Sequence, residues 1–386
     1  MPEKKSLLFV SSIRLPEESN PTARKKWSGL ADRFRVYVIG FSSGGFVRKS
    51  LFNCKFYGVP GNLWFPLRAG LYYLLTPLLT AYLTLRYNCR YWTAQGPYEG
   101  LSVWMVKYFL KPFKDPRLII EAHGDWIQSF VTIRTVPFKP FIEKLLRWIS
   151  PLLLYPADAF RSVSDETESM LESFNAYSRP HRNFPGFTDL ELFLETSYPE
   201  KEDLEKPRVL YVGALTELKG IPDLLKATKT LRDEAPDVQL RLCGEGNRER
   251  YQRTSSELGL TKSVEFLGEI PQTELVEEYL SCRLLVLPSY TEGLPRVLLE
   301  GLACYTPFVA TKTPGSKQIQ QESGAGRIVP RGDPPRLASA MLDLFFADKK
   351  RREMGKRGRQ YTENQYSVEQ FFDGYERLVN DINPVE

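Results

Sequence analysis

The chain has 386 residues, of which 42% are hydrophobic and 26% charged, and a formal net charge of +5. This composition is typical of globular proteins, and the length predicts two domains because single cores stop growing near roughly 250–300 residues. The mild basic excess contains no Lys/Arg cluster interleaved with aromatic residues, which argues against a nucleic-acid partner and favours an anionic membrane surface. Five scattered cysteines without CxxC or metal-ligand spacing indicate a reduced, cytoplasmic location.

The N-terminal half opens with alternating strand and helix patterns. Residues 6–10 read as a buried strand, residues 23–34 as a helix and residues 35–39 as the next strand. This order predicts a parallel, doubly wound α/β sheet. The loop after the first strand, SSIRLPEESNPTAR, contains no glycine.

His123 directly follows the strand predicted at residues 118–122. Because doubly wound sheets bind ligands beyond the C-terminal ends of their strands, we interpret His123 as a candidate active-site residue. A structural histidine is the alternative. His181 lacks such a context and is interpreted as structural.

Ser164 is expected to cap a helix, whereas Thr167, at the third helical position, is not expected to complete a capping box.

Two apolar stretches of this half allow more than one interpretation. Residues 63–87 carry no charge between Arg68 and Arg86, but Pro77 interrupts this interval, which is also slightly short of the roughly 20 residues that a spanning helix needs. A helix buried against the sheet and a membrane-surface element both remain open. Residues 137–154 combine basic side chains with an apolar face, which is typical of a membrane-interface helix or of a packed surface helix. That face contains Phe138, Phe141, Leu145 and Trp148.

The domain boundary is predicted from a stretch without apolar periodicity. Residues 196–207, TSYPEKEDLEKP, are charged and contain two prolines, as an interdomain linker does. We therefore expect an N-terminal domain at residues 1–195, a C-terminal domain at residues 208–365 and a final amphipathic helix within residues 366–386.

The C-terminal half contains a strand, a glycine turn and a helix within residues 284–311. Glu292 and Gly293 lie in the turn, and Leu294 and the proline after it open the helix. Such a turn and helix N-terminus form an anion site. Glu292 before the helix and Glu300 in its second turn can face the same opening, where carboxylates accept hydrogen bonds from sugar hydroxyls. The pattern suits a nucleotide sugar, and an ordinary βαβ unit with two surface glutamates is the alternative.

Two further loops of this half follow predicted strands. Gly213 opens the loop GALTELKG, and Lys219 lies near the end of that loop, just before a helix. Gly244 and Gly246 follow the strand at residues 238–242, where the backbone can approach a nucleotide, although one GxG is weak support. The chain contains no DxD pair, so we expect no chelated divalent metal at a diphosphate.

The order and spacing of four segments carry a family resemblance. VLYVGALTELKGIPDLLKA, LRLCGEGNRERY, VEFLGEIPQTELVEEY and LLVLPSYTEGLPRVLLEGLA resemble the donor half of retaining glycosyltransferases of family 4, which have the GT-B fold. The resemblance is close in the C-terminal half and loose in the N-terminal half. It implies two Rossmann-like doubly wound domains facing across a cleft, with the acceptor on the first, the nucleotide sugar on the second, and a last helix that crosses back.

The resemblance also implies a reaction and site residues. Sugar would pass from a nucleotide sugar, a UDP- or GDP-sugar, to a saccharide or lipid-linked acceptor with retention at the anomeric carbon, without a metal or other cofactor. The cysteines, the basic excess and the two apolar stretches add the expectation of a cytoplasmic location, peripheral on the inner face of the membrane. The catalytic residues implied are His123, Glu292 and Lys219. The donor-binding residues implied are Gly213, Lys219, Gly244, Ile270, Gly293, Leu294, Arg296 and Glu300.

Three departures from the family pattern keep other functions open. Ala214 replaces an arginine that usually faces the donor diphosphate, Tyr305 replaces a glycine, and the first loop lacks the usual Gly-Gly pair. Arg296 is placed to supply the missing charge. The alternatives are a sugar-nucleotide epimerase, a phosphorylase, for which no pyridoxal-phosphate lysine is marked, and a catalytically silent nucleotide-sugar-binding partner of another transferase.

Overall fold

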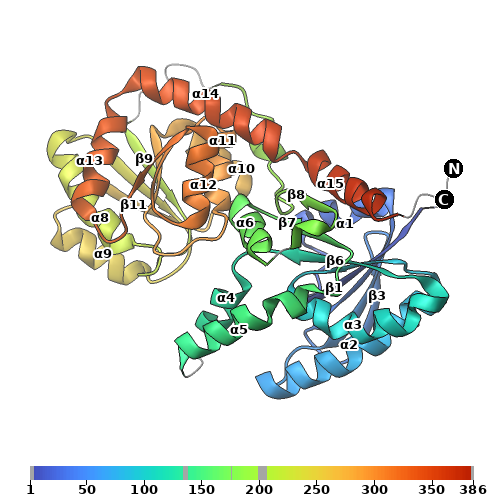
Figure 1. The fold of residues 1–386 in the computed structure, drawn as a ribbon. Helices are drawn as coiled ribbons and strands as arrows, with labels where there is room; N and C mark the ends of the chain where they lie inside the picture. Colours follow the sequence, from blue (N-terminus) through green and yellow to red (C-terminus); the bar gives the residue numbers. More distant parts are fainter. Residues whose placement is uncertain (1–3, 134–137, 175, 199–206, 384–386) are drawn as a thin grey trace. The chain divides into compact units, whose positions relative to one another are not determined.

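The computed structural model describes residues 4–133, 138–174, 176–198 and 207–383. Backbone contacts divide the chain into two units, each with its own parallel α/β sheet (Figure 1). Unit 1 comprises Met1–Phe187 and Glu369–Glu386, and unit 2 comprises Thr188–Val368. The α/β class and the two doubly wound domains expected from the sequence are confirmed.

The sheet of unit 1 has eight strands in the order β3-β4-β2-β1-β5-β6-β7-β8. Neighbouring strands run parallel except for the edge hairpin of β3 and β4, which is antiparallel. The strands are β1 Ser6–Arg14, β2 Arg35–Ser42, β3 Val47–Leu51, β4 Cys54–Pro60, β5 Tyr91–Ala94, β6 Arg117–Ala122, β7 Ala159–Ser162 and β8 His181–Asn183. The chain reverses its direction of travel across the sheet between β1 and β5, so the switch point lies there.

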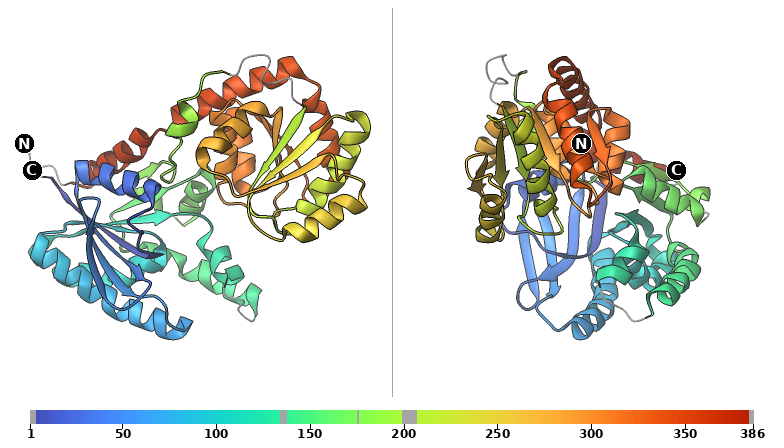
Figure 2. Two further views of the ribbon diagram at one scale, coloured as in Figure 1. Left: turned by 180° about the vertical axis from the view of Figure 1, so that it is seen from behind. Right: turned by 90° about the vertical axis from the view of Figure 1, so that its left-hand side faces the viewer.

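Helices cover both faces of this sheet (Figure 2). One face buries a cluster shared with α2, α3 and α5, and the other is covered by α1 and α15, where Phe9 packs edge-on against Trp27 at 5.2 Å and against Tyr375 at 5.5 Å. The helices of unit 1 are α1 Pro21–Arg33, α2 Phe65–Tyr87, α3 Pro97–Lys114, α4 Trp126–Ile133, α5 Lys139–Leu154, α6 Asp165–Ser173, a 3-10 turn at Ala176–Ser178, and α15 Val368–Asp381.

The start of α6 differs from the sequence prediction. Ser164 caps the helix as expected, and the hydroxyl of Thr167 also accepts from the Ser164 backbone N–H, so a reciprocal capping box is present. The prediction was wrong because a threonine hydroxyl can replace the glutamate or glutamine usually found at this position.

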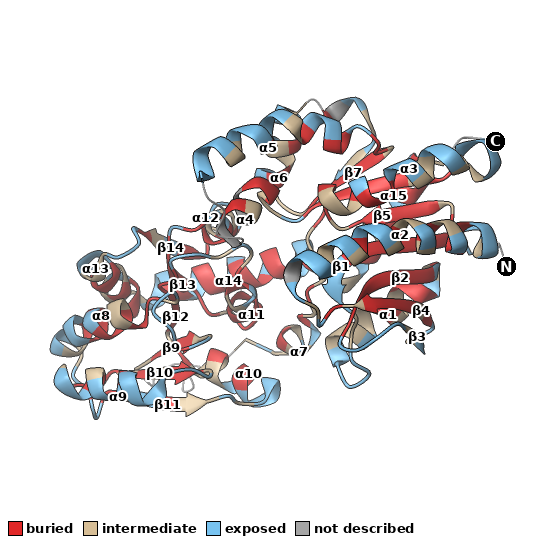
Figure 3. Ribbon diagram, turned by 90° about the horizontal axis from the view of Figure 1, so that it is seen from below, coloured by how far each residue is buried: buried red, intermediate tan, exposed pale blue. Residues whose placement is uncertain are grey.

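The sheet of unit 2 has six parallel strands in the order β11-β10-β9-β12-β13-β14. Figure 3 shows most of these strands as buried and the surrounding helices as exposed on their outer sides. The strands are β9 Arg208–Val212, β10 Gln239–Cys243, β11 Val264–Gly268, β12 Leu284–Leu287, β13 Phe308–Thr311 and β14 Gly326–Val329. The helices are α7 Glu191–Leu194, α8 Ile221–Glu234, α9 Arg248–Glu257, α10 Gln272–Ser281, α11 Arg296–Ala303, α12 Pro314–Ser323, α13 Pro334–Phe345 and α14 Asp348–Gln365.

The boundary between the units precedes the linker expected at residues 196–207, of which residues 199–206 lie outside the described part. Unit 2 begins at Thr188 because α7 packs against α10 and α11. Arg359 of α14 also donates to the carbonyl oxygens of Phe193, at 3.3 Å, and Leu194 at the end of α7. These contacts attach residues 188–195, which precede the expected linker, to unit 2.

Three helices of unit 1 expose an unusual number of large apolar side chains. In α2 the threonines Thr76, Thr80 and Thr84 are fully buried against the sheet, while Leu74 and Leu78 are more than 60% exposed on the outside. A helix that contacts only water on its outer side shows the reverse pattern. Within the described residues, no helix combines the length and hydropathy needed to cross a bilayer. We call the following exposed side chains of α2, α3 and α5 the apolar face: Leu67, Tyr73, Leu74, Leu78, Tyr82, Leu85, Leu101, Trp104, Met105, Tyr108, Phe109, Phe113, Phe141, Leu145, Trp148 and Leu152.

Candidate functional site

Lys219 and Glu292 meet beyond the C-terminal ends of the two central strands of the unit 2 sheet. They follow β9 and β12, which are neighbours in the sheet and lie where the strand order reverses. The backbone N–H of Tyr290 donates to the carbonyl of Leu218 at 2.9 Å and joins the two loops. Lys219 Nζ lies 2.6 Å from Glu292 Oε1, and the two side chains are 32% and 14% exposed. A partly open ion pair therefore occupies the switch point, where open α/β sheets bind ligands.

The helix start next to this pair differs slightly from the prediction. Pro295 is the N-cap residue rather than part of the first turn, and α11 begins at Arg296. The first bond of the helix runs from Leu298 N–H to the Pro295 carbonyl at 3.0 Å. The N–H groups of Arg296 and Val297 therefore precede the intrahelical ladder and can bind an anion.

Gly293 contributes to the site through its backbone, which packs closely on a neighbouring helix. A Cβ on Gly315 would lie only 1.8 Å from the Gly293 carbonyl oxygen, so the turn after β12 packs directly on the start of α12. Gly293 itself is exposed and has no atom near the position of its missing Cβ, while Leu294 packs against the core cluster of unit 2. This packing fixes the turn that presents Glu292.

Glu300 lies deeper than Glu292. It is 7% exposed, and its Oε2 accepts from the Tyr279 hydroxyl at 3.1 Å. Burial raises the pKa of the Glu300 carboxyl above its ordinary value, and the charge of Arg296 opposes this shift. Glu300 is therefore a buried residue of α11, and one of its carboxylate oxygens already accepts a hydrogen bond.

Gly244 and Gly246 are needed for contact between two loops, the other of which begins at Gly213. Gly244 has φ of 136°, and a Cβ there would lie 2.1 Å from the Gly213 carbonyl oxygen. Gly246 has φ of 144°, and its Cβ would lie 2.4 Å from the Leu215 carbonyl oxygen. These two close approaches and the positive φ values require glycine at both positions. Ile270 is half-buried against the same core cluster.

His123 of unit 1 is held by a buried carboxylate that the sequence interpretation missed. His123 Nε2 lies 2.5 Å from Glu121 Oε2, and the His123 side chain is 41% exposed whereas Glu121 is fully buried. Arg161 Nη1 also donates to Glu121 Oε2 at 2.9 Å, and the Tyr375 hydroxyl donates to the other oxygen. Burial alone would raise the pKa of Glu121, but Arg161, His123 and Tyr375 together lower it to about 2. Glu121 therefore remains an anion that orients His123.

One signal in the sequence could have identified Glu121. Residues i and i+2 of a strand point to the same face, and the motif EAHG places a carboxyl two residues before the histidine. Arg161 is the register partner of Glu121 on the neighbouring strand. The sequence does not show that pairing, because 40 residues separate the two side chains.

Two cavities lie at the His123 end of the unit 1 sheet. The first, of about 290 Å³, is lined by Glu121, His123, Trp126 and the loop after β5. The second, of about 210 Å³, is lined by Arg14 and Arg68 among others. Both share Ser12, Tyr98 and Glu99, so they adjoin. His181, by contrast, pairs with Glu168 at 3.0 Å and lines neither cavity.

Comparison with known proteins places the second half of the chain. Residues 195–361 match the family model "Glycosyl transferases group 1". The chain is 33% identical over 211 residues to a D-inositol 3-phosphate glycosyltransferase of Corynebacterium jeikeium, a segment that covers 50% of each chain. It is 29% identical over 219 residues to a GDP-mannose-dependent alpha-(1-6)-phosphatidylinositol monomannoside mannosyltransferase of Mycolicibacterium smegmatis, covering 53% of this chain and 57% of that one. The chain thus spans about half the length of these relatives.

Solved structures match the fold across both units. A glycosyltransferase from Rickettsia africae covers 99% of this chain and 100% of its own with a TM-score of 0.73 and 15% identity. Sucrose-phosphate synthase from Thermosynechococcus elongatus covers 98% and 99% with a TM-score of 0.70 and 20% identity. These likenesses give the GT-B fold. The segment that matches the group 1 glycosyl transferases, residues 195–361, carries both Lys219 and Glu292.

Proposed function

We propose that this protein is a retaining, metal-independent glycosyltransferase that moves a sugar from a nucleotide sugar to a saccharide or lipid-linked acceptor. The observation that carries the proposal is the Lys219–Glu292 pair at the switch point of unit 2, inside the segment that matches the family. Two of the relatives described above act on inositol-based acceptors by their names, which favours a polar, phosphate-bearing acceptor.

The donor side follows from the charges around the helix start. Lys219, Arg296 and the free N–H groups of α11 would bind the diphosphate and stabilise the charge that develops on it as the sugar leaves. Glu292 would then exchange its bond with Lys219 for bonds to sugar hydroxyls. Arg296 would replace the charge that is missing at Ala214, whose exposed position carries no side-chain donor.

The acceptor side is assigned to the adjoining cavities of unit 1. Glu121 holds His123 at their edge, so the imidazole would donate to or accept from a hydroxyl of the transferred sugar. Arg14 and Arg68 line the second cavity and would suit a phosphate on the acceptor.

A binding and hydrolysis assay tests the proposal. We expect one nucleotide sugar among UDP-, GDP- and ADP-sugars to raise the melting temperature and to be slowly hydrolysed without acceptor, releasing the sugar with its anomeric configuration retained. Binding without any hydrolysis or transfer would favour the silent partner protein. Conversion of the bound sugar to an epimer would favour the epimerase.

Removal of divalent metal is expected to leave transfer unchanged. The reason is that Lys219, Arg296 and helix N–H groups supply the positive charge that Mg²⁺ or Mn²⁺ supplies in DxD-containing transferases. The measurement is the initial transfer rate with excess EDTA and after addition of Mg²⁺ or Mn²⁺. Complete loss in EDTA, restored by either metal, would show that the reaction needs a cation.

We also propose that the protein docks on an anionic membrane through the apolar face. In α2 the leucines are exposed on the outer side and the threonines are buried on the inner side. This arrangement is expected of a surface that contacts lipid rather than water. Lys144 and Arg147 of α5 lie among these side chains and are exposed. The protein should therefore float with anionic vesicles at low salt, and raised salt should weaken binding because exposed charges are screened within about 8 Å at physiological ionic strength. Absence of flotation at low salt would indicate a soluble acceptor.

A further inference from the structure

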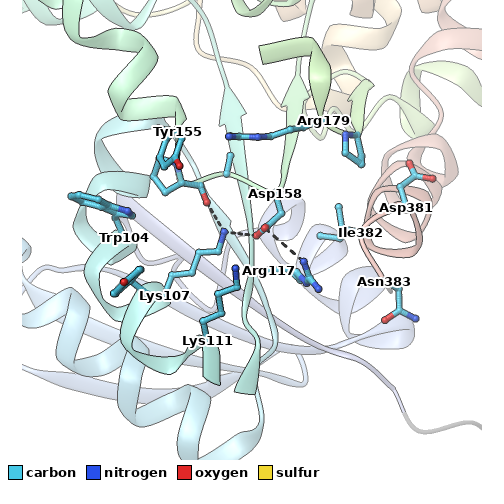
Figure 4. Close-up of a pocket in the computed structure, with 14 residues that line it drawn as sticks. Trp104, Lys107, Lys111, Arg117, Tyr155, Asp158, Arg179, Asp381, Ile382 and Asn383 are labelled. Carbon is cyan, nitrogen blue, oxygen red and sulfur yellow. Dashed lines mark hydrogen bonds and ion pairs between the residues drawn. The ribbon is translucent and has the colours of Figure 1, made fainter. Parts of the chain in front are cut away.

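A third cavity opens at the opposite end of the unit 1 sheet from His123. Figure 4 shows the residues that line it. It has a volume of about 680 Å³. Arg117, the first residue of β6, lines it, as do Asp158 just before β7 and Pro180 just before β8. His123 follows the other end of β6, and a strand of that length spans roughly 20 Å. The cavity is therefore separate from the candidate acceptor site.

Positive charge dominates this cavity. Its lining includes Lys107, Lys111, Arg117 and Arg179 but only two carboxylates, Asp158 and Asp381.

Both carboxylates of the cavity are already engaged. Asp158 Oδ2 accepts from Lys107 Nζ and from the Leu118 N–H, each at 2.6 Å (Figure 4 shows the lysine contact). Asp381 is held by both ends of the Arg182 guanidinium at 2.7 and 3.0 Å, and Arg182 does not line the cavity.

Two cations of the lining keep uncompensated charge. Among the described residues, no carboxylate lies within salt-bridge distance of Lys111 or Arg179. Lys107, Lys111 and Arg179 line the same cavity. Burial lowers the pKa of Lys107, Asp158 opposes that shift, and the charges of Arg179 and Lys111 lower it further. Such a cluster favours an anionic ligand.

The rim of the cavity is aromatic and continuous with the apolar face. Trp104 and Tyr108 of α3 and Tyr155 at the end of α5 all line it, and all three are exposed. Met105 and Phe109, the next residues of α3, extend the apolar face away from the cavity. Trp and Tyr are the side chains that proteins place at the level of lipid headgroups.

We propose that this cavity binds the phosphate headgroup of an anionic phospholipid whose acyl chains lie along the apolar face. Lys111 and Arg179 bind the phosphate, and Trp104 and Tyr108 lie at the boundary between headgroup and acyl chain. The inference rests on the membrane docking proposed above and is independent of sugar transfer. It adds a defined headgroup site to what would otherwise be diffuse attraction between basic side chains and the membrane.

A charge-matched pair of variants separates the cavity from diffuse attraction. The cavity variant is Lys111→Gln with Arg179→Gln, and the control is Lys144→Gln with Arg147→Gln, which removes the same charge from exposed positions of the apolar face. Partitioning onto phosphatidylcholine vesicles with phosphatidylglycerol is measured at low and at raised salt. Lys111 is exposed and Arg179 is half-buried, so what separates them from the control pair is that they line one cavity. Because direct hydrogen bonds to a phosphate survive screening better than diffuse attraction does, we expect the cavity variant at raised salt to bind about tenfold more weakly than the unmodified protein, and the control to bind within about twofold. Equal losses in both variants would overturn the proposal.

Two further measurements make the result specific. Vesicles with brominated acyl chains should quench Trp104 in the unmodified protein, with Trp104→Phe as the baseline, and the cavity variant should lose this quenching. Inorganic phosphate tests the other source of the same chemistry. If phosphate protects the unmodified protein against heat but not the cavity variant, while both bind vesicles equally, the site serves free phosphate and the lipid assignment fails. An unmodified protein that binds no vesicles overturns the headgroup site but leaves sugar transfer untouched.

Discussion

Replacing His123 with alanine is expected to lower the rate of sugar transfer by about 10–100-fold while nucleotide affinity stays within about twofold. The imidazole belongs to unit 1, whereas Lys219, Glu292 and the start of α11 belong to unit 2, so the nucleotide loses no contact. The loss corresponds to one hydrogen bond to a charged or developing charged group, about 1.5–3 kcal/mol. Transfer rate and nucleotide Kd are measured on the same preparation. Glu292→Ala should also lower turnover, through lost bonds to sugar hydroxyls.

The second histidine gives a matched control for this result. His181→Ala removes an imidazole that pairs with Glu168 and lines neither cavity at the His123 end, so transfer should be unchanged. If His123→Ala transfers sugar at the unmodified rate, the histidine is structural and the assignment of an active-site group in unit 1 fails.

Replacing Glu121 with glutamine is expected to lower the free energy of unfolding by about 3–5 kcal/mol. The change leaves Arg161, which is 1% exposed, without its counter-ion inside unit 1. The free energy of unfolding is measured by urea denaturation. The difference in this free energy between Glu121→Gln and the unmodified protein should depend on pH. Because the folded pKa of Glu121 is lowered to about 2, its contribution is complete above the ordinary glutamate pKa near 4.3 and is lost as pH falls toward 2.

A half-buried glutamate of the same unit is the control for this stability effect. Glu168 pairs with His181 and is 27% exposed, so Glu168→Gln should change the free energy of unfolding by less than about 1 kcal/mol. A loss of similar size in both variants would mean that general charge balance, rather than the buried pair, sets the stability of unit 1.

The sequence predicted unit 2 better than unit 1. Several strands of unit 2 contain short apolar runs followed by glycine or proline, and Leu284–Leu287 before Pro288 reads as a buried strand on its own. Unit 1 contains elements whose pattern is not apolar. The edge strand Val47–Leu51 is mostly exposed, so its sequence VRKSL carries no strand signal, and it forms because the neighbouring Cys54–Pro60 offers an antiparallel partner.

The candidate site was predictable where it depends on local sequence. Lys219 and Glu292 each lie in a loop after a strand. The family resemblance assigned both residues to one site, and the structure shows that their side chains form an ion pair. The cluster around Glu121 was not predictable, because Tyr375 lies 254 residues away in the chain. The close contacts of Gly244 and Gly246 were not predictable for a similar reason, since their partners lie in the loop after another strand.

The position of Tyr375 has a consequence for synthesis on the ribosome. Until α15 emerges, Phe9 lacks its contact with Tyr375, and Glu121 and Arg161 lack their tyrosine partner. All of Thr188–Val368 must be translated first, which takes roughly 10–40 s at about 5–20 residues per second. The first unit to begin synthesis is therefore the last to complete its core. The nascent chain carries an unfinished sheet for that interval, and a folding helper that binds exposed apolar strands would act on it there.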